Sequence, residues 1–208
     1  MINLKYIVTG CGRSGTVFTA KLLTKLGIPC GHECIFDYQS FDKIALKLFN
    51  PQMRELSYCS THDLTNLDDS PEEIEKWVES SETIAESSYM AAPYLHLPEL
   101  NDVKIIHIVR NPIKVISSFV KSLNYFKEKE PSNEWEVKIY SVLTDLKNIP
   151  TQIERACFYY CKWNELIEKN KDKKYFLSKI ENIENNQAFF DFIQKNKQEI
   201  CLSKQTNV

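Results

Sequence analysis

Residues 6–18, YIVTGCGRSGTVF, place glycines, one arginine and two hydroxyl side chains directly after a short apolar run. Backbone N–H groups and the positive end of a following helix can converge on an anion at such a place, and glycine lets the backbone approach closely. In nucleotide triphosphatases, the last glycine of this loop is followed by a lysine and then by a Ser or Thr that binds Mg²⁺. Here those two positions hold Thr16 and Val17.

The positive charge of this loop is carried by Arg13 instead. Arg13 offers a planar guanidinium, and Ser14 and Thr16 add hydroxyl donors. The loop therefore predicts an anion site that needs no magnesium. A tight glycine turn without a ligand is the alternative.

A second basic position lies in IIHIVRNPIKVISSF, residues 105–119, where Arg110 ends an apolar run. Ser118 follows eight positions later, inside the helix that Asn111 and Pro112 are expected to begin. Two positively biased places at strand ends suggest a ligand with two separated phosphates.

The order RSGT, then VRNP, then a serine eight residues after the second arginine resembles the sulfotransferases that use 3'-phosphoadenosine 5'-phosphosulfate (PAPS). In that family the first loop binds the 5'-phosphosulfate, and the arginine and serine of the second motif bind the 3'-phosphate. The resemblance implies that the 5' end is held by Gly12, Arg13, Ser14, Gly15, Thr16 and the backbone of Val17. It implies that Arg110 and Ser118 bind the 3'-phosphate. Phe18 occupies the position of an aromatic that stacks on adenine in some members, although it also fits the apolar stripe of the helix.

The resemblance also implies a reaction, in which a sulfuryl group moves in line, without a metal, to an acceptor hydroxyl or amine. Negative charge grows on the bridging oxygen, so donors aimed there, with Arg13 among them, lower the barrier. A base must accept the acceptor's proton, and we expect Glu33 to serve, with His32 next. An unperturbed glutamate has a pKa of about 4.3 and a histidine one near 6.5, so histidine needs less tuning. The alternatives are a hydrogen-bonded structural His32 and a solvated or helix-capping Glu33.

Other polar residues are weaker candidates. Glu86, Ser87 and Ser88 end a predicted strand and could face the acceptor, although strand-end serines more often cap the next helix. His107 lies inside an apolar strand and is expected to be a hydrogen-bonded core histidine. The spacing of Cys30 and Cys34 is not that of a standard zinc site, so we expect no metal.

The elements that must position these residues alternate between strand and helix. Strands are predicted at 4–9, 28–30, 82–88, 103–109 and 174–180, and helices at 14–26, 41–49, 71–78, 112–123, 151–167 and 186–196. Residues 127–135 are charged and loop-like. This pattern predicts an α/β fold with a parallel sheet, in which ligands bind at the carboxyl ends of strands. The resemblance makes it a three-layer α/β/α sulfotransferase fold related to the P-loop nucleotide triphosphatases, as one domain over residues 1–208.

Composition limits the partners. The 208 residues hold 26 Lys and Arg against 28 Asp and Glu, which excludes the basic footprint of a nucleic-acid binder. No signal peptide or membrane-spanning apolar stretch is visible, and the odd set of seven cysteines is typical of reduced thiols, so a cytoplasmic protein is expected. We expect a small-molecule or carbohydrate acceptor and leave the oligomeric state open. The rival functions are a P-loop small-molecule or nucleotide kinase and a non-catalytic nucleotide-sensing module.

Overall fold

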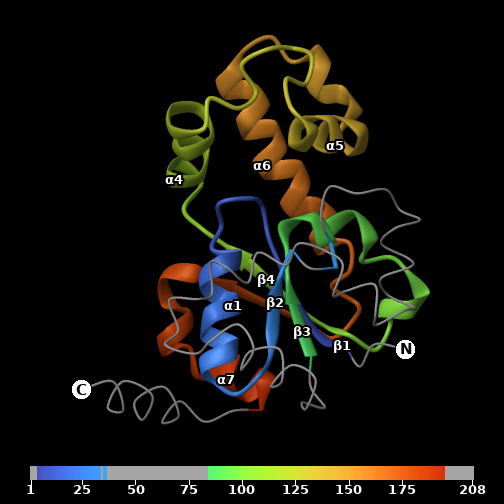
Figure 1. Ribbon diagram of the computed structural model, residues 1–208, viewed down its shortest axis with the longest axis vertical. Helices are drawn as coiled ribbons and strands as arrows, with labels where there is room; N and C mark the ends of the chain where they lie inside the picture. Colours follow the sequence, from blue (N-terminus) through green and yellow to red (C-terminus); the bar gives the residue numbers. More distant parts are fainter. Residues whose placement is uncertain (1–3, 34, 37–83, 195–208) are drawn as a thin grey trace, which may run out of the picture.

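The computed structural model describes residues 4–33, 35–36 and 84–194, and the centre of this part is a five-stranded sheet (Figure 1). Every strand pair is parallel, and the order across the sheet is β2-β3-β1-β4-β5. The strands are β1 (Leu4–Thr9), β2 (Cys30–His32), β3 (Ile84–Ser87), β4 (Lys104–Val109) and β5 (Tyr175–Lys179). All five expected strands are present, although the second begins two residues later than expected.

Helices connect the strands. The longer ones in the described residues are α1 (Thr16–Lys25), α4 (Pro112–Ser117), α5 (Glu134–Val142), α6 (Gln152–Glu168) and α7 (Gln187–Ile193). Shorter helical turns are η3 (Tyr89–Tyr94), η4 (Pro98–Leu100), η5 (Ser118–Ser122), η6 (Thr144–Asn148) and η7 (Ile180–Asn185). The helices predicted at 41–49 and 71–78 lie outside the described residues. None of the described helices combines the length and apolar character needed to cross a bilayer.

The helix boundaries differ from the sequence prediction in three places. The first helix begins at Thr16, because the preceding loop continues through Gly15 with a left-handed φ of 106°. The predicted helix 112–123 is divided into α4 and a π-helical turn. α5 begins inside the segment that was expected to be a loop, because the Asn133 side chain accepts a hydrogen bond from the Glu136 N–H and caps it.

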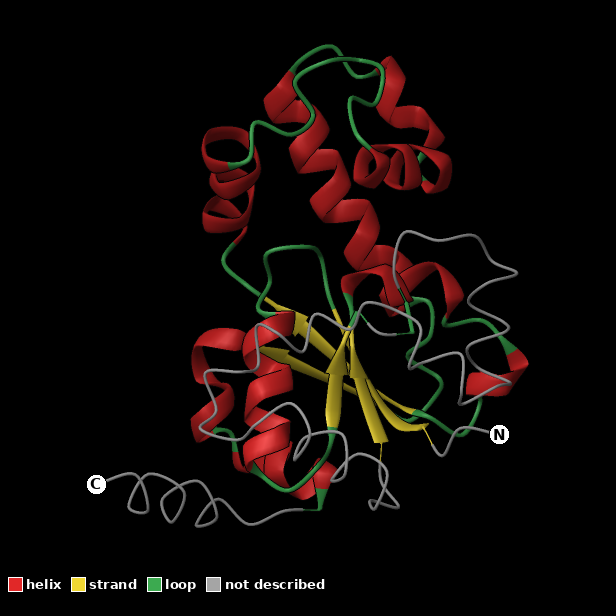
Figure 2. Ribbon diagram, viewed as in Figure 1, coloured by secondary structure: helices red, strands yellow, loops and turns green. Residues whose placement is uncertain are grey.

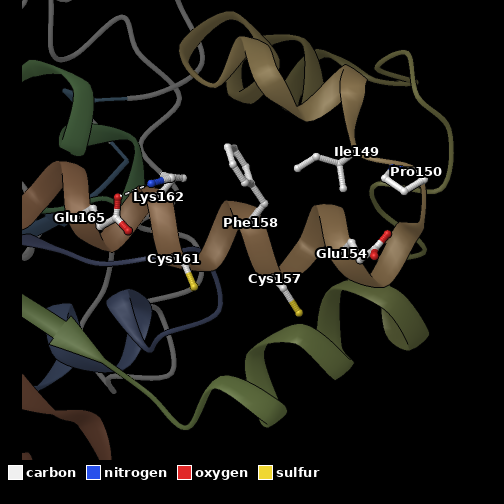
Figure 3. Close-up of a pocket in the computed structure, with 8 residues that line it drawn as sticks. All are labelled: Ile149, Pro150, Glu154, Cys157, Phe158, Cys161, Lys162 and Glu165. Atoms are coloured by element: carbon white, nitrogen blue, oxygen red, sulfur yellow. Dashed lines mark hydrogen bonds and ion pairs between the residues drawn. The ribbon is translucent and has the colours of Figure 1, made fainter.

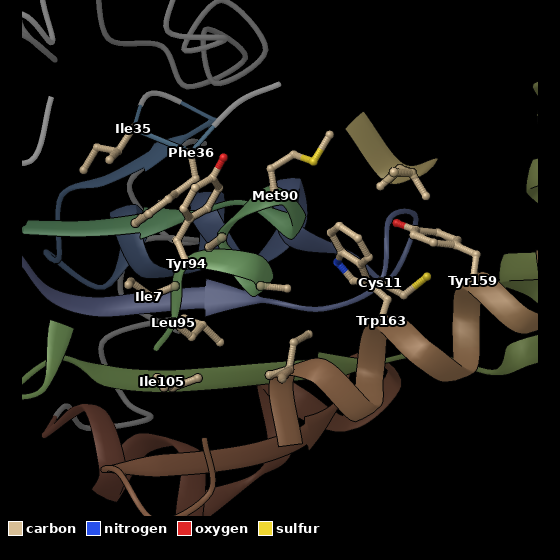
Figure 4. Close-up of a cluster of buried hydrophobic side chains, with 14 of the residues drawn as sticks. Ile7, Cys11, Ile35, Phe36, Met90, Tyr94, Leu95, Ile105, Tyr159 and Trp163 are labelled. Carbon is tan, nitrogen blue, oxygen red and sulfur yellow. The ribbon is translucent and has the colours of Figure 1, made fainter. Parts of the chain in front are cut away.

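Helices cover both faces of the sheet, which confirms the three-layer α/β/α architecture (Figure 2). Side chains alternate between the faces of a strand, so neighbouring residues of β1 enter different cores. Val8 packs with α1 and α7, in a core that includes Leu23 and Phe190. Ile7 packs on the opposite face with η3 and α6, in a core that includes Trp163 (Figure 4).

α4, α5 and the N-terminal half of α6 form a helical lobe beyond the sheet (Figure 1). Its core is aromatic, with Phe119, Phe126, Trp135 and Tyr159 in contact at ring-centroid distances between 5.2 and 5.7 Å. The buried Arg155 guanidinium donates hydrogen bonds to the carbonyl oxygens of residues 126, 127, 149 and 150. Arg155, in the first turns of α6, therefore joins this helix to the segment before α5 and to the segment just before α6.

Candidate functional site

The glycine loop between β1 and α1 has a backbone that only small residues permit. Gly15 has a left-handed φ of 106°, and a Cβ atom there would lie 2.6 Å from the Ile180 side chain. A Cβ on Gly10 would lie 2.2 Å from the Ile108 carbonyl oxygen of β4. Arg13 also has a positive φ, of 67°, which is uncommon for a residue with a side chain. The loop is thus held close to both β4 and the turn after β5.

Several hydrogen-bond donors of this loop have no protein partner in the described part of the chain. No side chain caps α1, and the backbone N–H groups of Gly15, Thr16 and Val17 have no acceptor among the described residues. The Ser14 side chain is buried, and its hydroxyl is likewise without a hydrogen-bond partner there. Uncapped N–H groups and the helix dipole favour an anion at a helix N-terminus. The residues present therefore fit a phosphate or phosphosulfate group.

The two basic motifs meet at the carboxyl ends of β1 and β4. The Arg13 Nε donates a hydrogen bond to the Ser118 Oγ at 3.1 Å, and the Arg110 Nη1 donates to the Arg13 carbonyl oxygen at 3.2 Å. Arg13 is exposed, while Arg110 and Ser118 are half-buried. Residues separated by about a hundred positions in the sequence thus form one basic site.

An acidic side chain, Glu181, lies beside Arg110 and the start of α4. The backbone N–H of Glu181 forms a hydrogen bond with the Glu181 carboxyl and lowers its pKa. The Asn111 N–H, Lys114 and Arg110 lower this pKa further. The Glu181 Oε1 accepts that Asn111 N–H at 3.3 Å. The Glu181 carboxylate therefore offsets part of the positive charge around Arg110.

The two base candidates lie at the end of β2, next to the glycine loop. The buried His32 ring places its Nε2 3.2 Å from the Thr16 Oγ1 and 3.7 Å from the Glu33 Oε1. The Glu33 side chain keeps 29% of its surface exposed, and its backbone has a positive φ of 57°. His32 thus connects the strand-end carboxylate with the first helical residue after the loop.

Glu86, Ser87 and Ser88 have structural contacts at the end of β3. The Glu86 Oε1 accepts a hydrogen bond from the Ile35 N–H at 2.9 Å, and the Ser88 Oγ donates to the Phe36 carbonyl at 2.6 Å and caps η3. The Ser87 Oγ donates to the Thr16 carbonyl at 2.8 Å. All three residues are buried, so they support the segments that carry the site.

Two further sequence predictions concern aromatic side chains. Phe18 is 42% exposed and so lies outside the buried stripe of α1, which consists of Thr16, Thr19, Ala20, Leu22 and Leu23. The expectation that it fits the apolar stripe is therefore wrong. His107 is buried as expected, with its Nδ1 2.5 Å from the Tyr175 hydroxyl and its Nε2 2.8 Å from the Asn164 Oδ1.

Two tyrosines of α6 contact the backbone of the site, and no motif in the sequence indicates these contacts. The Gly12 N–H donates a hydrogen bond to the Tyr159 hydroxyl at 3.2 Å, and the Tyr160 hydroxyl donates to the Arg110 carbonyl at 2.9 Å. A buried tyrosine hydroxyl usually has a partner, but the sequence does not say which backbone group supplies it.

Other features of α6 lie apart from this site. An open hollow of about 520 Å³ follows its outer face between Pro150 and Glu165, and none of its lining residues belongs to the glycine loop or to β2 (Figure 3). Cys157 and Cys161 line it as free thiols. Within the described residues no group of three or more His, Cys, Asp or Glu side chains could hold a metal, and Cys34 is outside them.

The chain matches the model of a known protein family. The family described as Sulfotransferase domain matches residues 4–189, a range that contains the glycine loop, the β2 end and the Arg110 motif. A search of curated proteins finds no match.

Proposed function

The chain belongs to the sulfotransferase family, and on that premise we propose that it transfers a sulfuryl group from PAPS to a hydroxyl or amine of a small-molecule or carbohydrate acceptor. Sulfuryl transfer as such follows from the family. The donor, the acceptor class and the roles of individual residues are the proposal.

The observation that carries the proposal is the contact of Arg13 with Ser118 and of Arg110 with the Arg13 backbone. A donor with phosphates at both its 3' and 5' positions needs two cationic subsites within one binding site. The N-terminus of α1 supplies one with Arg13, and the start of α4 supplies the other with Arg110 and Ser118. Val17 carries no hydroxyl at the position where nucleotide triphosphatases bind Mg²⁺, so we assign the charge compensation to protein groups.

During transfer, the bond between sulfur and the bridging oxygen breaks, and a bond from sulfur to the acceptor oxygen or nitrogen forms. The electron pair of the broken bond stays on the bridging oxygen, which becomes part of the leaving phosphate. The Arg13 Nη groups and the N–H groups of Gly15, Thr16 and Val17 have no acceptor in the described part of the chain. These preorganised donors stabilise the developing charge.

The acceptor loses a proton as its bond to sulfur forms. We assign the base to Glu33, because its carboxylate is partly exposed whereas His32 is buried against Thr16. His32 then orients the carboxylate from 3.7 Å. The proton passes to Glu33, and adenosine 3',5'-bisphosphate leaves.

Two measurements on the full chain test the proposal. Adenosine 3',5'-bisphosphate should raise the thermal unfolding midpoint, whereas ATP with Mg²⁺ should raise it less at equal concentration. Radiolabelled sulfate from PAPS should then appear on an acceptor in a screen of alcohols, sugars and amines. Preferential stabilisation by ATP with Mg²⁺ would favour the kinase, and bisphosphate binding without any transfer would favour the sensing module.

A further inference from the structure

We propose that Tyr159 and Tyr160 are positioning residues that hold the two phosphate subsites at a fixed separation, with Tyr159 acting on the 5' subsite and Tyr160 on the 3' subsite. The inference rests on the proposed function, because it concerns the same donor. It adds that α6, which contributes no side chain to either predicted motif, decides the preference for a bisphosphorylated nucleotide.

Tyr159 acts on the glycine loop. Its hydroxyl accepts the Gly12 N–H at 3.2 Å, and both residues are buried. The tyrosine ring is fixed among Phe119, Phe126 and Trp163 at centroid distances of 5.2 to 5.4 Å, so the hydroxyl has a defined position. Figure 4 shows Tyr159 and Trp163 on α6. This contact takes up the Gly12 N–H, and the N–H groups of Gly15, Thr16 and Val17 have no acceptor in the described part of the chain.

Tyr160 acts on the second motif. Its hydroxyl donates to the Arg110 carbonyl at 2.9 Å, at the point where β4 has ended and α4 has not begun. Arg110 is the residue whose guanidinium reaches back to the Arg13 carbonyl. The hydroxyl therefore fixes the backbone from which the predicted 3'-phosphate ligand extends.

Consecutive residues of an α-helix are fixed about 1.5 Å apart along the axis and about 100° around it. Two subsites held by neighbouring residues of one helix consequently cannot move independently. α6 itself is joined to the sheet by the Asn164 Oδ1, 2.8 Å from the His107 Nε2 of β4. It is joined to η3 by the Trp163 Nε1, which donates to the Tyr89 carbonyl at 2.9 Å. A functional site gains precision when it is supported by such a rigid element.

The test removes single hydroxyl groups and measures two nucleotides by isothermal titration calorimetry. Adenosine 3',5'-bisphosphate occupies both subsites, and adenosine 5'-monophosphate occupies only the 5' subsite. Tyr159→Phe should weaken both nucleotides by about threefold to tenfold and leave the ratio of their Kd values unchanged. Tyr160→Phe should weaken the binding of the bisphosphate by a similar factor and leave the binding of the monophosphate unchanged. The ratio of the monophosphate Kd to the bisphosphate Kd should therefore fall.

Tyr140→Phe is the matched control. The Tyr140 hydroxyl donates to the Glu128 carbonyl at 3.1 Å, which is the same type of bond between two segments of the helical lobe and involves neither motif. This variant should leave both affinities unchanged. Thermal unfolding of each variant shows whether it folds. If Tyr159→Phe does not fold, the titrations of Tyr160→Phe decide the inference, because Tyr160 is only half-buried.

The outcomes separate the inference from the proposed function. If the wild-type protein binds no bisphosphate, the proposed function fails and the inference fails with it. If the wild type prefers the bisphosphate but both variants bind as it does, only the inference is overturned. Equal weakening of both nucleotides by Tyr160→Phe would also overturn it, because that result indicates general loosening and not control of one subsite.

Discussion

At the scale of single residues, the candidate site depends on which hydrogen-bond donors have no acceptor in the described part of the chain and can therefore bind a ligand. The Arg13 Nε is bound to Ser118, yet the Nη groups of this exposed side chain have no acceptor in the described part of the chain. Arg110 uses only its Nη1 on the Arg13 carbonyl. Each arginine thus supports the other motif and still offers hydrogen bonds to an anion.

Arg110→Ala should weaken the binding of adenosine 3',5'-bisphosphate by about 1–3 kcal/mol, because a charge-assisted hydrogen bond is lost. Calorimetry measures the change. Lys171→Ala is the control, since it removes an equal charge from an exposed position between α6 and β5, at the amino ends of the strands and away from both motifs. Equal affinities of Arg110→Ala and the wild type would refute the 3'-phosphate assignment.

Glu33→Gln should slow sulfuryl transfer by about a hundredfold or more, because an amide cannot accept the acceptor's proton. The bisphosphate affinity should stay at its wild-type value, since Glu33 has no role in donor binding. Initial rates with labelled PAPS measure the first effect and calorimetry the second. Glu184→Gln, an exposed residue of η7, is the control. A fully active Glu33→Gln would transfer the role of base to His32.

At the scale of elements, the junction between the glycine loop and α1 depends on backbone conformation. Gly15→Ala should lower the free energy of unfolding by about 1–3 kcal/mol, because alanine is strained at a φ of 106° and its Cβ meets Ile180. It should also weaken bisphosphate binding by moving the first N–H groups of α1. Urea denaturation and calorimetry measure the two effects.

Gly27 provides the control for that substitution. It has a φ of 74° at the other end of α1, so Gly27→Ala should destabilise the protein through the same backbone strain. Its bisphosphate affinity should be unchanged. A Gly15→Ala protein that binds as tightly as Gly27→Ala would show that the junction does not shape the anion site.

The sequence predicted the elements whose signals are local. β4 is an almost unbroken apolar run, and α6 carries apolar residues at helical spacing, so both were predicted within one residue. α5 was not predicted, because Glu136 at its start reads in the sequence as one more surface charge of a loop. In the structure Glu136 is buried and accepts hydrogen bonds from the N–H groups of Phe126 and Ser132. Phe18 was misplaced because the buried stripe of α1 is centred on Thr16, Thr19 and Leu23, which leaves Phe18 outside it.

The candidate site was predictable only in part, because some of its contacts depend on packing between segments that are distant in the sequence. The residue types and spacing of the glycine loop and the VRNP segment are typical of an anion site. The tyrosine contacts depend on how α6 packs against two strand ends, and no spacing along the chain encodes that packing. The supporting role of Ser87 likewise requires β3 to lie beside β1.

At the scale of the whole molecule, His107 joins three elements. It lies in β4, and its ring nitrogens contact Tyr175 of β5 and Asn164 of α6. Burial lowers the pKa of His107 from its ordinary 6.5, and the hydrogen bond with Asn164 and the charge of Glu168 oppose this only in part. The folded protein therefore holds the neutral imidazole.

This shift gives the stability a pH dependence of known sign. Below pH 6.5 the unfolded chain binds a proton that the folded protein does not, so the free energy of unfolding should fall as the pH decreases from 6.5 toward the lowered pKa. Urea denaturation between pH 7.5 and pH 5 measures the slope. His107→Gln should be less stable at pH 7.5 but show a shallower slope. An unchanged slope in His107→Gln would contradict the assignment.

The hydrogen bonds that complete the anion site join partners 97, 105 and 147 positions apart. Loop-closure entropy opposes contacts between such distant residues until much of the chain is ordered. The glycine loop therefore acquires its final shape late on the folding pathway, although its residues are among the first in the chain. A folding intermediate that has formed only β1 and α1 possesses the motif but lacks the binding site.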